Sequence, residues 1–372
     1  MRRFHRLTAQ LLTSDSWPLI SCLLLLTSSI CSAQDFIIHH MDVGQGDCTF
    51  IQTRCRTILV DAGNSGKGKS VVIPYLESLG VSHINYVIAS HYHADHIGGL
   101  DEVLNAFDVD TVFDRGTIHP VPSSKIYASY VKAVGRTPRV TVQPGKRFTI
   151  APCIALHFVA ADGVCEGDQP SITDPATERS IDENSLSIAF TITYIDTSGH
   201  PCTVNTLCSL RHVERSEIPQ GGAPCSVFTY FTGGDLTGYD HRDAIDLETS
   251  VARIIGHVDA MKVNHHGSRS STHQTFISIL SPACVFISLA RNNSYGHPAP
   301  EVISRLQQMP TIRWIYQTEG KTTLSPKQKI VGTSVLKFYA RSDSSYFTVQ
   351  WNDMGKHVDR YFCNFLQCIP NP

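Results

Sequence analysis

The sequence predicts an α/β fold in four layers, an αβ/βα sandwich in which two β-sheets lie between outer layers of helices. Three observations support this prediction. Short strand-like segments cluster near the start of the chain, strands and helices then alternate, and several apolar strands stop at glycine-rich turns that carry an acid or a histidine. With 372 residues, of which 42% are hydrophobic and 17% charged, the chain can fill one large domain or two smaller ones.

The individual elements follow from short apolar runs that stop at turn residues. Strands are predicted at residues 36–40, 49–52, 57–61, 86–90, 111–113, 140–142, 154–160, 187–194, 226–231, 260–263 and 285–288. Helices are predicted at residues 71–79, 101–107, 123–135, 245–256 and 300–309. Residues 162–182 and 197–224 look like long irregular insertions, which would be surface loops or lids near a site.

The most informative segment is His91-Tyr92-His93-Ala94-Asp95-His96, in which four of the six residues are metal-ligand types. It follows an apolar run that is predicted to be a buried strand, and it precedes a Gly-Gly turn that opens a helix. Ligands at a strand end are held by a rigid sheet and still face a cleft. Imidazole and carboxylate together suit zinc, manganese or iron better than calcium or magnesium. The alternative is a histidine-rich surface loop, which rarely places ligand types this densely.

Other predicted strands end at the same residue types. Asp61, Asp235, the pair His265-His266 and His297 each follow an apolar strand at a turn. Because these residues lie far apart in the sequence but always at strand ends, we expect them to converge on one edge of the sheets.

In this order, the residues resemble the metallo-β-lactamase superfamily. The closer resemblance is to one branch, the C-terminal hydrolase domain of the competence protein ComEC and its stand-alone relatives, and it covers roughly residues 35–339. The motifs that carry it are Asp42-Val43-Gly44-Gln45-Gly46-Asp47, the His91–Gly99 segment, Glu183-Asn184-Ser185-Leu186-Ser187, Gly234-Asp235, His265-His266-Gly267-Ser268 and Tyr295-Gly296-His297-Pro298. The resemblance implies the metallo-β-lactamase fold, and it is much less specific for the substrate.

The resemblance also implies two divalent metal ions, zinc or manganese. The ligands that it implies are His91, His93, Asp95, His96, Asp235 and His265. The first two would hold one ion, Asp95, His96 and His265 would hold the other, and Asp235 would bridge both. The superfamily usually supplies a third histidine to the first ion, but Asn184-Ser185 stands in that place here. We therefore expect the first site to be weaker or completed by water.

Two ions held in this way lower the pKa of a bridging water to near neutrality, so that the resulting hydroxide can attack phosphorus or a carbonyl. Asp95 would act both as a ligand and as a partner of the hydroxide. Asp61 is expected to orient the ligands through hydrogen bonds. His266 and His297 are candidates to bind a phosphate or to protonate the leaving oxygen, with a packing residue and a turn residue as the respective alternatives.

The expected function is an exported metal-dependent hydrolase, a dinuclear phosphodiesterase or nuclease that acts on DNA, another nucleic acid or a phosphorylated cell-envelope component. A lactonase or β-lactamase-type hydrolase is an alternative, as is a DNA-handling module without turnover. The net charge of −2 is not that of a general nucleic-acid binder. A local basic rim, or merely a solvated surface, is expected from Lys67, Lys69, Lys262, Arg269 and Arg291.

A nucleotide-binding protein is a rival of another class, because residues 63–70 match the P-loop pattern between a strand and a helix. Three points count against it: an exported chain meets little nucleoside triphosphate, Asp61 places a negative charge near the phosphates, and the metal motif uses the same sheet. We interpret the segment as a Gly/Lys loop on the rim of a cleft and expect no nucleotide cofactor.

The N-terminus is predicted to be a signal peptide, residues 1–33, with arginines before an apolar run and a small-residue cleavage site. Its removal would leave no membrane anchor, a hydrolase domain at residues 34–340 and a C-terminal extension at residues 341–372. The chain would then be periplasmic or secreted.

The number of cysteines is consistent with an exported protein. Twelve cysteines are present, and ten remain after removal of the signal peptide, an even number that favours disulfides in an oxidising compartment. Those in predicted loops or extensions are Cys165, Cys202, Cys208, Cys363 and Cys368.

Overall fold

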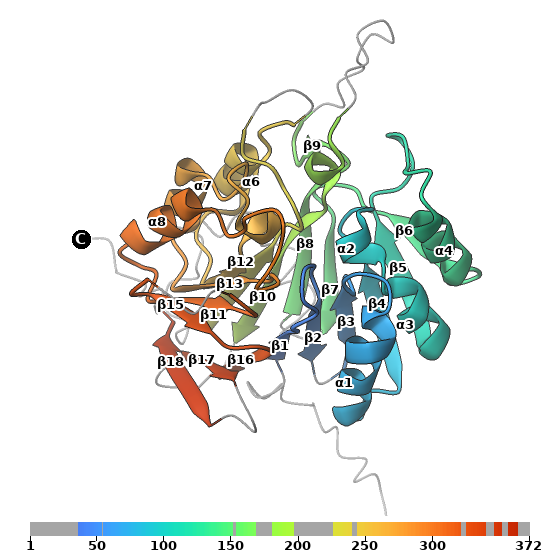
Figure 1. The fold of residues 1–372 in the computed structure, drawn as a ribbon, viewed down its shortest axis with the longest axis horizontal. Helices are drawn as coiled ribbons and strands as arrows, with labels where there is room; N and C mark the ends of the chain where they lie inside the picture. Colours follow the sequence, from blue (N-terminus) through green and yellow to red (C-terminus); the bar gives the residue numbers. More distant parts are fainter. Residues whose placement is uncertain are drawn as a thin grey trace, which may run out of the picture. The chain divides into compact units, whose positions relative to one another are not determined.

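Two β-sheets form the centre of the structure, which is a computed structural model (Figure 1). The strands of the first sheet are β1 (Phe36–His40), β2 (Thr49–Thr53), β3 (Thr57–Val60), β4 (His83–Ile88), β5 (Asp108–Asp114), β6 (Arg139–Thr141), β16 (Ser334–Tyr339), β17 (Tyr346–Trp351) and β18 (His357–Phe362). The strands of the second sheet are β7 (Arg147–Ala151), β8 (Ile154–Ala161), β9 (Val164–Cys165), β10 (Ala189–Asp196), β11 (Ser226–Thr232), β12 (Ala260–Lys262), β13 (Cys284–Ile287), β14 (Trp314–Gln317) and β15 (Gln328–Ile330). The helices are α1 (Ile73–Ser78), α2 (Ala94–Ile97), α3 (Leu100–Ala106), α4 (Lys125–Val134), α6 (Glu248–Ile255), α7 (Gln274–Leu280) and α8 (Pro300–Gln308), with the short helical segments η2 (Gly68–Val72), η4 (Glu183–Leu186) and η5 (Asn264–Gly267).

The structure describes residues 36–53, 55–151, 154–168, 181–196, 226–239, 244–320, 325–339, 346–351 and 356–363, all within the unit Ser32–Pro372. The expected signal peptide lies outside these residues, as does most of the two expected insertions. Within the described ranges, no helix is both long and apolar enough to cross a bilayer.

The strand order places the parallel strands of each sheet side by side. The first sheet runs β18-β17-β16-β1-β2-β3-β4-β5-β6, and the second runs β15-β14-β13-β12-β11-β10-β8-β7, with β9 paired to β8. Strands β3 to β6 are parallel to one another, and so are strands β11 to β15. Parallel neighbours end at the same edge of a sheet, which is where ligand-binding loops of α/β proteins gather.

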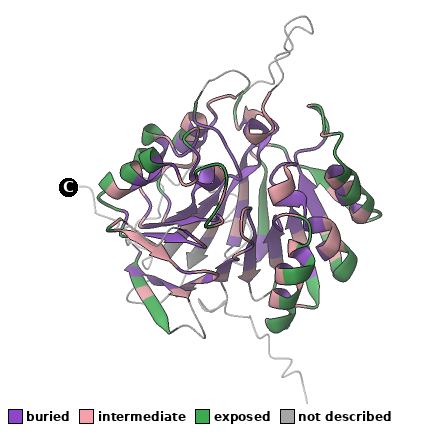
Figure 2. Cartoon of the chain, in the orientation of Figure 1, coloured by how far each residue is buried: buried purple, intermediate pink, exposed green. Residues whose placement is uncertain are grey.

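Helices cover the outer face of each sheet (Figure 1). One buried apolar cluster joins α1, α3 and α4 to strands β3–β5, and another joins α6, α7 and α8 to strands β12–β13. In α6, Val251 and Ala252 are buried whereas Arg253 is exposed, the pattern of a helix with one apolar face. Figure 2 shows the same division, with buried strands and exposed outer surfaces on the helices.

Aromatic side chains fill the space between the two sheets. The ring centre of Phe228 in β11 lies 5.7 Å from Phe36 in β1 and 5.1 Å from Phe338 in β16. Farther along the sheets, Phe113 in β5 lies 5.5 Å from Phe158 in β8. Such pairs add directional contacts to the burial of apolar area. The order helix, sheet, sheet, helix confirms the predicted four-layer sandwich.

The C-terminal strands differ from the expected organisation. The boundary expected at residue 340 falls inside the first sheet, because β17 pairs with β16 and β18 pairs with β17. Strands β17 and β18 therefore extend the sheet instead of forming a separate extension. The sequence pattern did not predict α7, β14 or β15. These elements are short, and packing against neighbouring elements determines where they form.

Candidate metal centre

The loops after β3, β4, β11 and β12 bring the predicted ligand types together from both sheets. His96, which follows β4 of the first sheet, places its Nε2 atom 3.2 Å from Oδ1 of Asp235, which follows β11 of the second. His265, after β12, places its Nε2 atom 3.6 Å from Oδ2 of the same carboxylate. His96 and Asp235, which are 139 positions apart in the chain, thus meet across the two sheets.

Two overlapping groups of side chains could each hold a metal ion. The first group consists of His91, His93 and Asp235, and the second consists of Asp47, His96, Asp235 and His266. Within each group, one ligand atom from every residue lies within 4.8 Å of the others. Asp235 belongs to both groups, as expected for a residue that bridges two ions.

The second group leaves its polar atoms without partners. Both carboxylate oxygens of Asp47, Nε2 of His96, Oδ1 of Asp235 and Nε2 of His266 are buried and accept or donate no hydrogen bond within the described residues. Unpartnered polar atoms in a protein interior cost free energy. A divalent cation would satisfy all of these atoms at once, so the donor set fits a metal ion.

Asp61 orients His96 in the way that the sequence predicted. Its Oδ2 atom accepts a hydrogen bond of 2.8 Å from Nδ1 of His96, and its Oδ1 atom accepts one of 2.8 Å from the backbone N–H of Ser90. With Nδ1 donating, Nε2 of His96 faces Asp235. Burial alone would lower the pKa of His96, but the carboxylates of Asp235 and Asp61 raise it above its usual value in the metal-free chain.

His266, not His265, belongs to the second group, which differs from the expected ligand set. His265 and His266 both have left-handed backbone conformations, with φ of 49° and 52°, and this turn directs the His266 ring inward. Nδ1 of His266 donates to the carbonyl of Ser288 at 2.8 Å, so Nε2 is left facing Asp235 and Asp95. Because His266 is fully buried, it is poorly placed to bind a phosphate, contrary to its expected role.

Asp47 is a ligand candidate that the sequence analysis missed. Gly46 has φ of +136°, and a Cβ atom there would lie 2.3 Å from the carbonyl oxygen of Asp95. This close approach allows the backbone N–H of Asp47 to donate to the same carbonyl at 3.0 Å and turns Asp47 into the site. Asp95 itself lies beside the second group, with Oδ2 at 3.4 Å from Nε2 of His266. The feature of the sequence that could have identified Asp47 is its position as an acidic residue directly after a Gly-x-Gly motif.

Lys262 is a buried part of the centre, so the expectation that it lies on a basic rim is wrong. Its side chain is 2% exposed. Nζ lies 2.6 Å from Oδ2 of Asp47, and the two groups form an ion pair whose angles are not those of a hydrogen bond. Nζ also donates to the carbonyl of Val263 at 2.9 Å. Its charge balances part of the negative charge of the converging carboxylates.

Glu248, at the start of α6, holds the loop that carries the two histidines. Its carboxylate accepts hydrogen bonds from the side chain of Asn264 at 2.7 Å and from the backbone N–H groups of Thr272 and His273 at 2.6 and 2.8 Å. Burial raises the pKa of Glu248 to about 7, although these three donors act in the opposite direction. The hydrogen bonds to Glu248 thus hold the loop that contains the left-handed turn at His265 and His266 against the start of α6.

The segment at η4 supplies no third imidazole but connects both halves of the centre. Oε1 of Glu183 accepts the backbone N–H of Tyr92, between the two histidines of the first group, at 2.8 Å. Oγ of Ser187 accepts the backbone N–H of Asp235 at 3.1 Å. The first group therefore has three protein ligands against four in the second, in line with the expected weaker first site.

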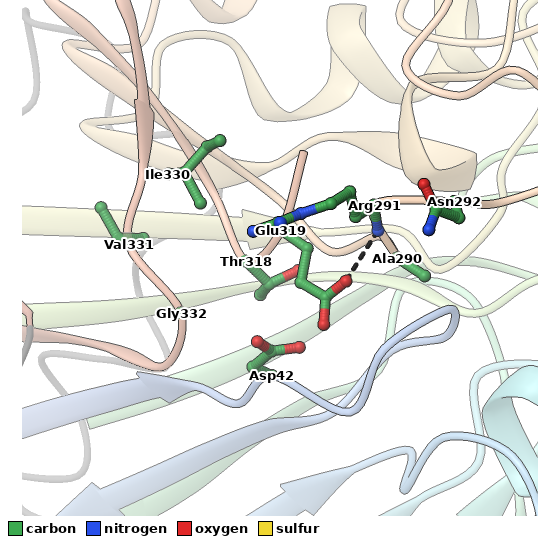
Figure 3. A pocket seen from close by; sticks show the side chains of 9 residues that line it. All are labelled: Asp42, Ala290, Arg291, Asn292, Thr318, Glu319, Ile330, Val331 and Gly332. Atoms are coloured by element: carbon green, nitrogen blue, oxygen red, sulfur yellow. Dashed lines mark hydrogen bonds between the residues drawn. The ribbon is translucent and has the colours of Figure 1, made fainter. Parts of the chain in front are cut away.

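The smaller of two hollows lies at this edge, and it differs from the larger in having no acidic side chain in its lining. The smaller, of about 320 Å³, is lined by His265, Arg269, Tyr295 and His297 among others. The larger, of about 560 Å³, lies away from both ligand groups, and the carboxylates of Asp42 and Glu319 face it (Figure 3). Acidic side chains repel phosphate, so the smaller hollow is the better approach for an anionic substrate.

The segment that matches the P-loop pattern already has an anionic partner within the chain. Oε1 of Glu102 accepts the backbone N–H of Gly66 at 2.7 Å, and Oε2 accepts that of Lys69 at 2.5 Å. These are amide groups of the kind that would bind phosphate in a P-loop. The carboxylate of Glu102 in α3 thus already occupies these two amide groups.

The described cysteines do not form the expected disulfides. Cys165 and Cys363 are both free and buried, as are Cys48 and Cys284, whereas Cys55 is free and exposed. Cys202, Cys208 and Cys368 lie outside the described residues.

Residues 41–165, which include Asp47, Asp61 and the His91–His96 segment, match the family model described as Metallo-beta-lactamase superfamily. Over these residues the chain is similar to that superfamily. Its fold, two facing sheets with outer helices, agrees with this assignment.

Curated relatives confirm the resemblance of this chain to the ComEC branch. ComE operon protein 3 of Bacillus subtilis is 25% identical over 334 residues, covering 84% of this chain and 36% of that protein. Recombination protein 2 of Haemophilus influenzae is 25% identical over 295 residues (78% and 29%), and competence protein ComA of Neisseria gonorrhoeae is 24% identical over 268 residues (72% and 29%). The chain thus spans between 29% and 36% of the length of these relatives.

Proposed function

We propose that the protein is a metal-dependent phosphodiesterase that acts on nucleic acid. The observation that supports this most strongly is the pair of ligand groups joined by Asp235, next to a hollow lined by Arg269 and His297. Two neighbouring divalent ions suit in-line displacement at phosphorus, because they stabilise both the attacking and the leaving oxygen. The names of the relatives, which refer to competence and recombination, favour nucleic acid as the phosphodiester.

Different residues would hold each of the two ions. His91, His93 and Asp235 would hold one ion, and Asp47, His96, His266 and Asp235 would hold the other. When bound, the ions would supply an activated water and neutralise charge on the phosphate. Hydrogen bonds from the Asp61 carboxylate and the Ser288 carbonyl keep Nε2 of His96 and of His266 directed inward.

His297 and Arg269 would contact the substrate at the rim. Arg269 is exposed and lines the smaller hollow, where its charge can attract a phosphate. Burial lowers the pKa of His297 to about 4, with nearby His265 acting in the same direction. At neutral pH the His297 ring is therefore uncharged, which suits hydrogen bonding to a phosphate better than protonation of the leaving oxygen.

The purified protein should hydrolyse bis-(p-nitrophenyl) phosphate and a DNA strand in the presence of zinc or manganese. A chelator should stop both reactions, and added metal should restore them, since the ions would supply the activated water and neutralise charge on the phosphate. Absorbance at the nitrophenolate band and gel analysis of the strand measure the two rates. Hydrolysis of nitrocefin with no phosphodiester cleavage would instead favour a β-lactamase-type enzyme, and DNA binding without turnover would favour a non-catalytic module.

We also propose that the chain is exported, on the strength of its N-terminal arginines, apolar run and Ser32-Ala33 cleavage site. N-terminal sequencing of the protein from cells that process it should start at Gln34. A protein that keeps Met1 and stays in the cytoplasm would refute this part of the proposal.

A further inference from the structure

Tyr295 is an exposed aromatic side chain beside the metal centre. It is 69% exposed, and its ring lies parallel to that of His297, at an angle of 13° and a centre-to-centre distance of 5.7 Å. His297 in turn lies 5.6 Å from the ring of His265, whose Nε2 atom is 3.6 Å from the shared carboxylate of Asp235. A row of rings thus leads from the metal centre to an aromatic face that is open to solvent.

The loop that carries Tyr295 is held in place by its own polar contacts. The side chain of Asn293 donates to the carbonyls of Ala290 and His297 at 2.9 and 2.8 Å, and it accepts the backbone N–H of His297 at 2.9 Å. These three bonds close the loop below Tyr295. The aromatic face is therefore fixed before a ligand arrives, which lowers the entropy cost of binding.

A second set of contacts joins this loop to the one that carries the site histidines. The backbone N–H of Ala299 donates to the carbonyl of Gly267 at 2.8 Å. A Cβ atom at Gly267 would lie 2.8 Å from Cβ of Pro298, so only glycine permits this approach. The smaller hollow lies where these two loops meet, and both Tyr295 and Arg269 line it.

We infer that Tyr295, backed by His297, is a stacking platform for a nucleobase, and that Arg269 binds the phosphate next to the one that is cleaved. The inference rests on the proposed phosphodiesterase function and adds to it a subsite that binds a base. An aromatic face beside a positive charge is the arrangement by which proteins hold single strands, and it tolerates any sequence because every base has a π-face.

Steady-state kinetics on two strands of equal length test the inference. One strand is oligothymidylate and the other has the same sugar–phosphate backbone without bases. Tyr295→Ala should raise KM for oligothymidylate about tenfold, equivalent to about 1.4 kcal/mol, with little change in kcat. The same substitution should leave KM for the abasic strand unchanged, and Tyr295→Phe should restore the KM for oligothymidylate. Phe362→Ala is the matched control, because Phe362 is an exposed aromatic residue on β18, outside the hollow.

The possible outcomes separate the platform from the proposed function. An equal change in KM for both strands, or no change for either, overturns the platform while leaving the phosphodiesterase intact. A wild-type protein that cleaves neither strand refutes the proposed function. In that case, equilibrium binding of the same two strands decides the platform, which requires weaker binding of oligothymidylate by Tyr295→Ala and equal binding of the abasic strand.

Discussion

Replacing Asp235 with Asn should abolish phosphodiester hydrolysis and lower the metal content of the protein from two ions per chain to less than one. Asp235 is the residue shared by the two ligand groups, and its carboxylate is buried against His96. An amide cannot bind two cations at once, so both ions lose a ligand. We expect kcat/KM for bis-(p-nitrophenyl) phosphate to fall at least about a thousandfold, equivalent to about 4 kcal/mol. Elemental analysis after dialysis measures the metal content.

Two further variants define what this result means. Asp47→Asn touches only the four-residue group, so it should remove one ion and leave the His91–His93 group loaded. Asp108→Asn removes an exposed carboxylate at the start of β5 and should change neither metal content nor rate. If Asp235→Asn keeps both ions, the assignment of Asp235 as the shared ligand is wrong.

Replacing Arg115 with Met should lower the free energy of unfolding by about 3–5 kcal/mol. The Arg115 side chain is fully buried and donates to both carboxylate oxygens of Glu183, at 2.9 and 2.8 Å, and to Asp162 at 3.0 Å. Methionine fills much of the volume but leaves the two acids without their partner. Urea denaturation followed by circular dichroism measures the change as a lower midpoint with an unchanged slope.

The same ion pair links stability to the site. Because Glu183 also accepts the backbone N–H of Tyr92, Arg115→Met should weaken metal binding at His91 and His93 more than at the second group. Arg136→Met, at an exposed position after α4, should stay within about 0.5 kcal/mol of the wild type. Adding Glu183→Leu to Arg115→Met should recover part of the lost stability, since it removes an unpaired buried charge. A single variant as stable as the wild type would show that the ion pair contributes little.

Much of the centre could be predicted because metal-binding residue types were concentrated at strand ends. The segment His91–His96 and the isolated Asp235 stood next to strongly apolar strands, and these strands form as expected. Two residues of the second group were not assigned. Asp47 enters through a glycine-dependent approach of one loop to another, and His266 enters through two successive left-handed residues. Neither conformation has a reliable signature in residue type or spacing.

The sequence by itself determined the four-layer class and the order of the strands that end in ligand-type residues. Both follow from local apolar patterning and residue chemistry, which act over a few positions in the chain. The carboxylate shared between two sites was implied only by the resemblance to the metallo-β-lactamase superfamily. Only the tertiary structure decided that His266 lies with Asp47, His96 and Asp235, that Lys262 is buried against Asp47, and that Tyr295 faces solvent beside the centre. Each of these depends on how loops from different strands pack against one another. Contacts between distant segments of the chain do not produce a periodic pattern of residue types in the sequence.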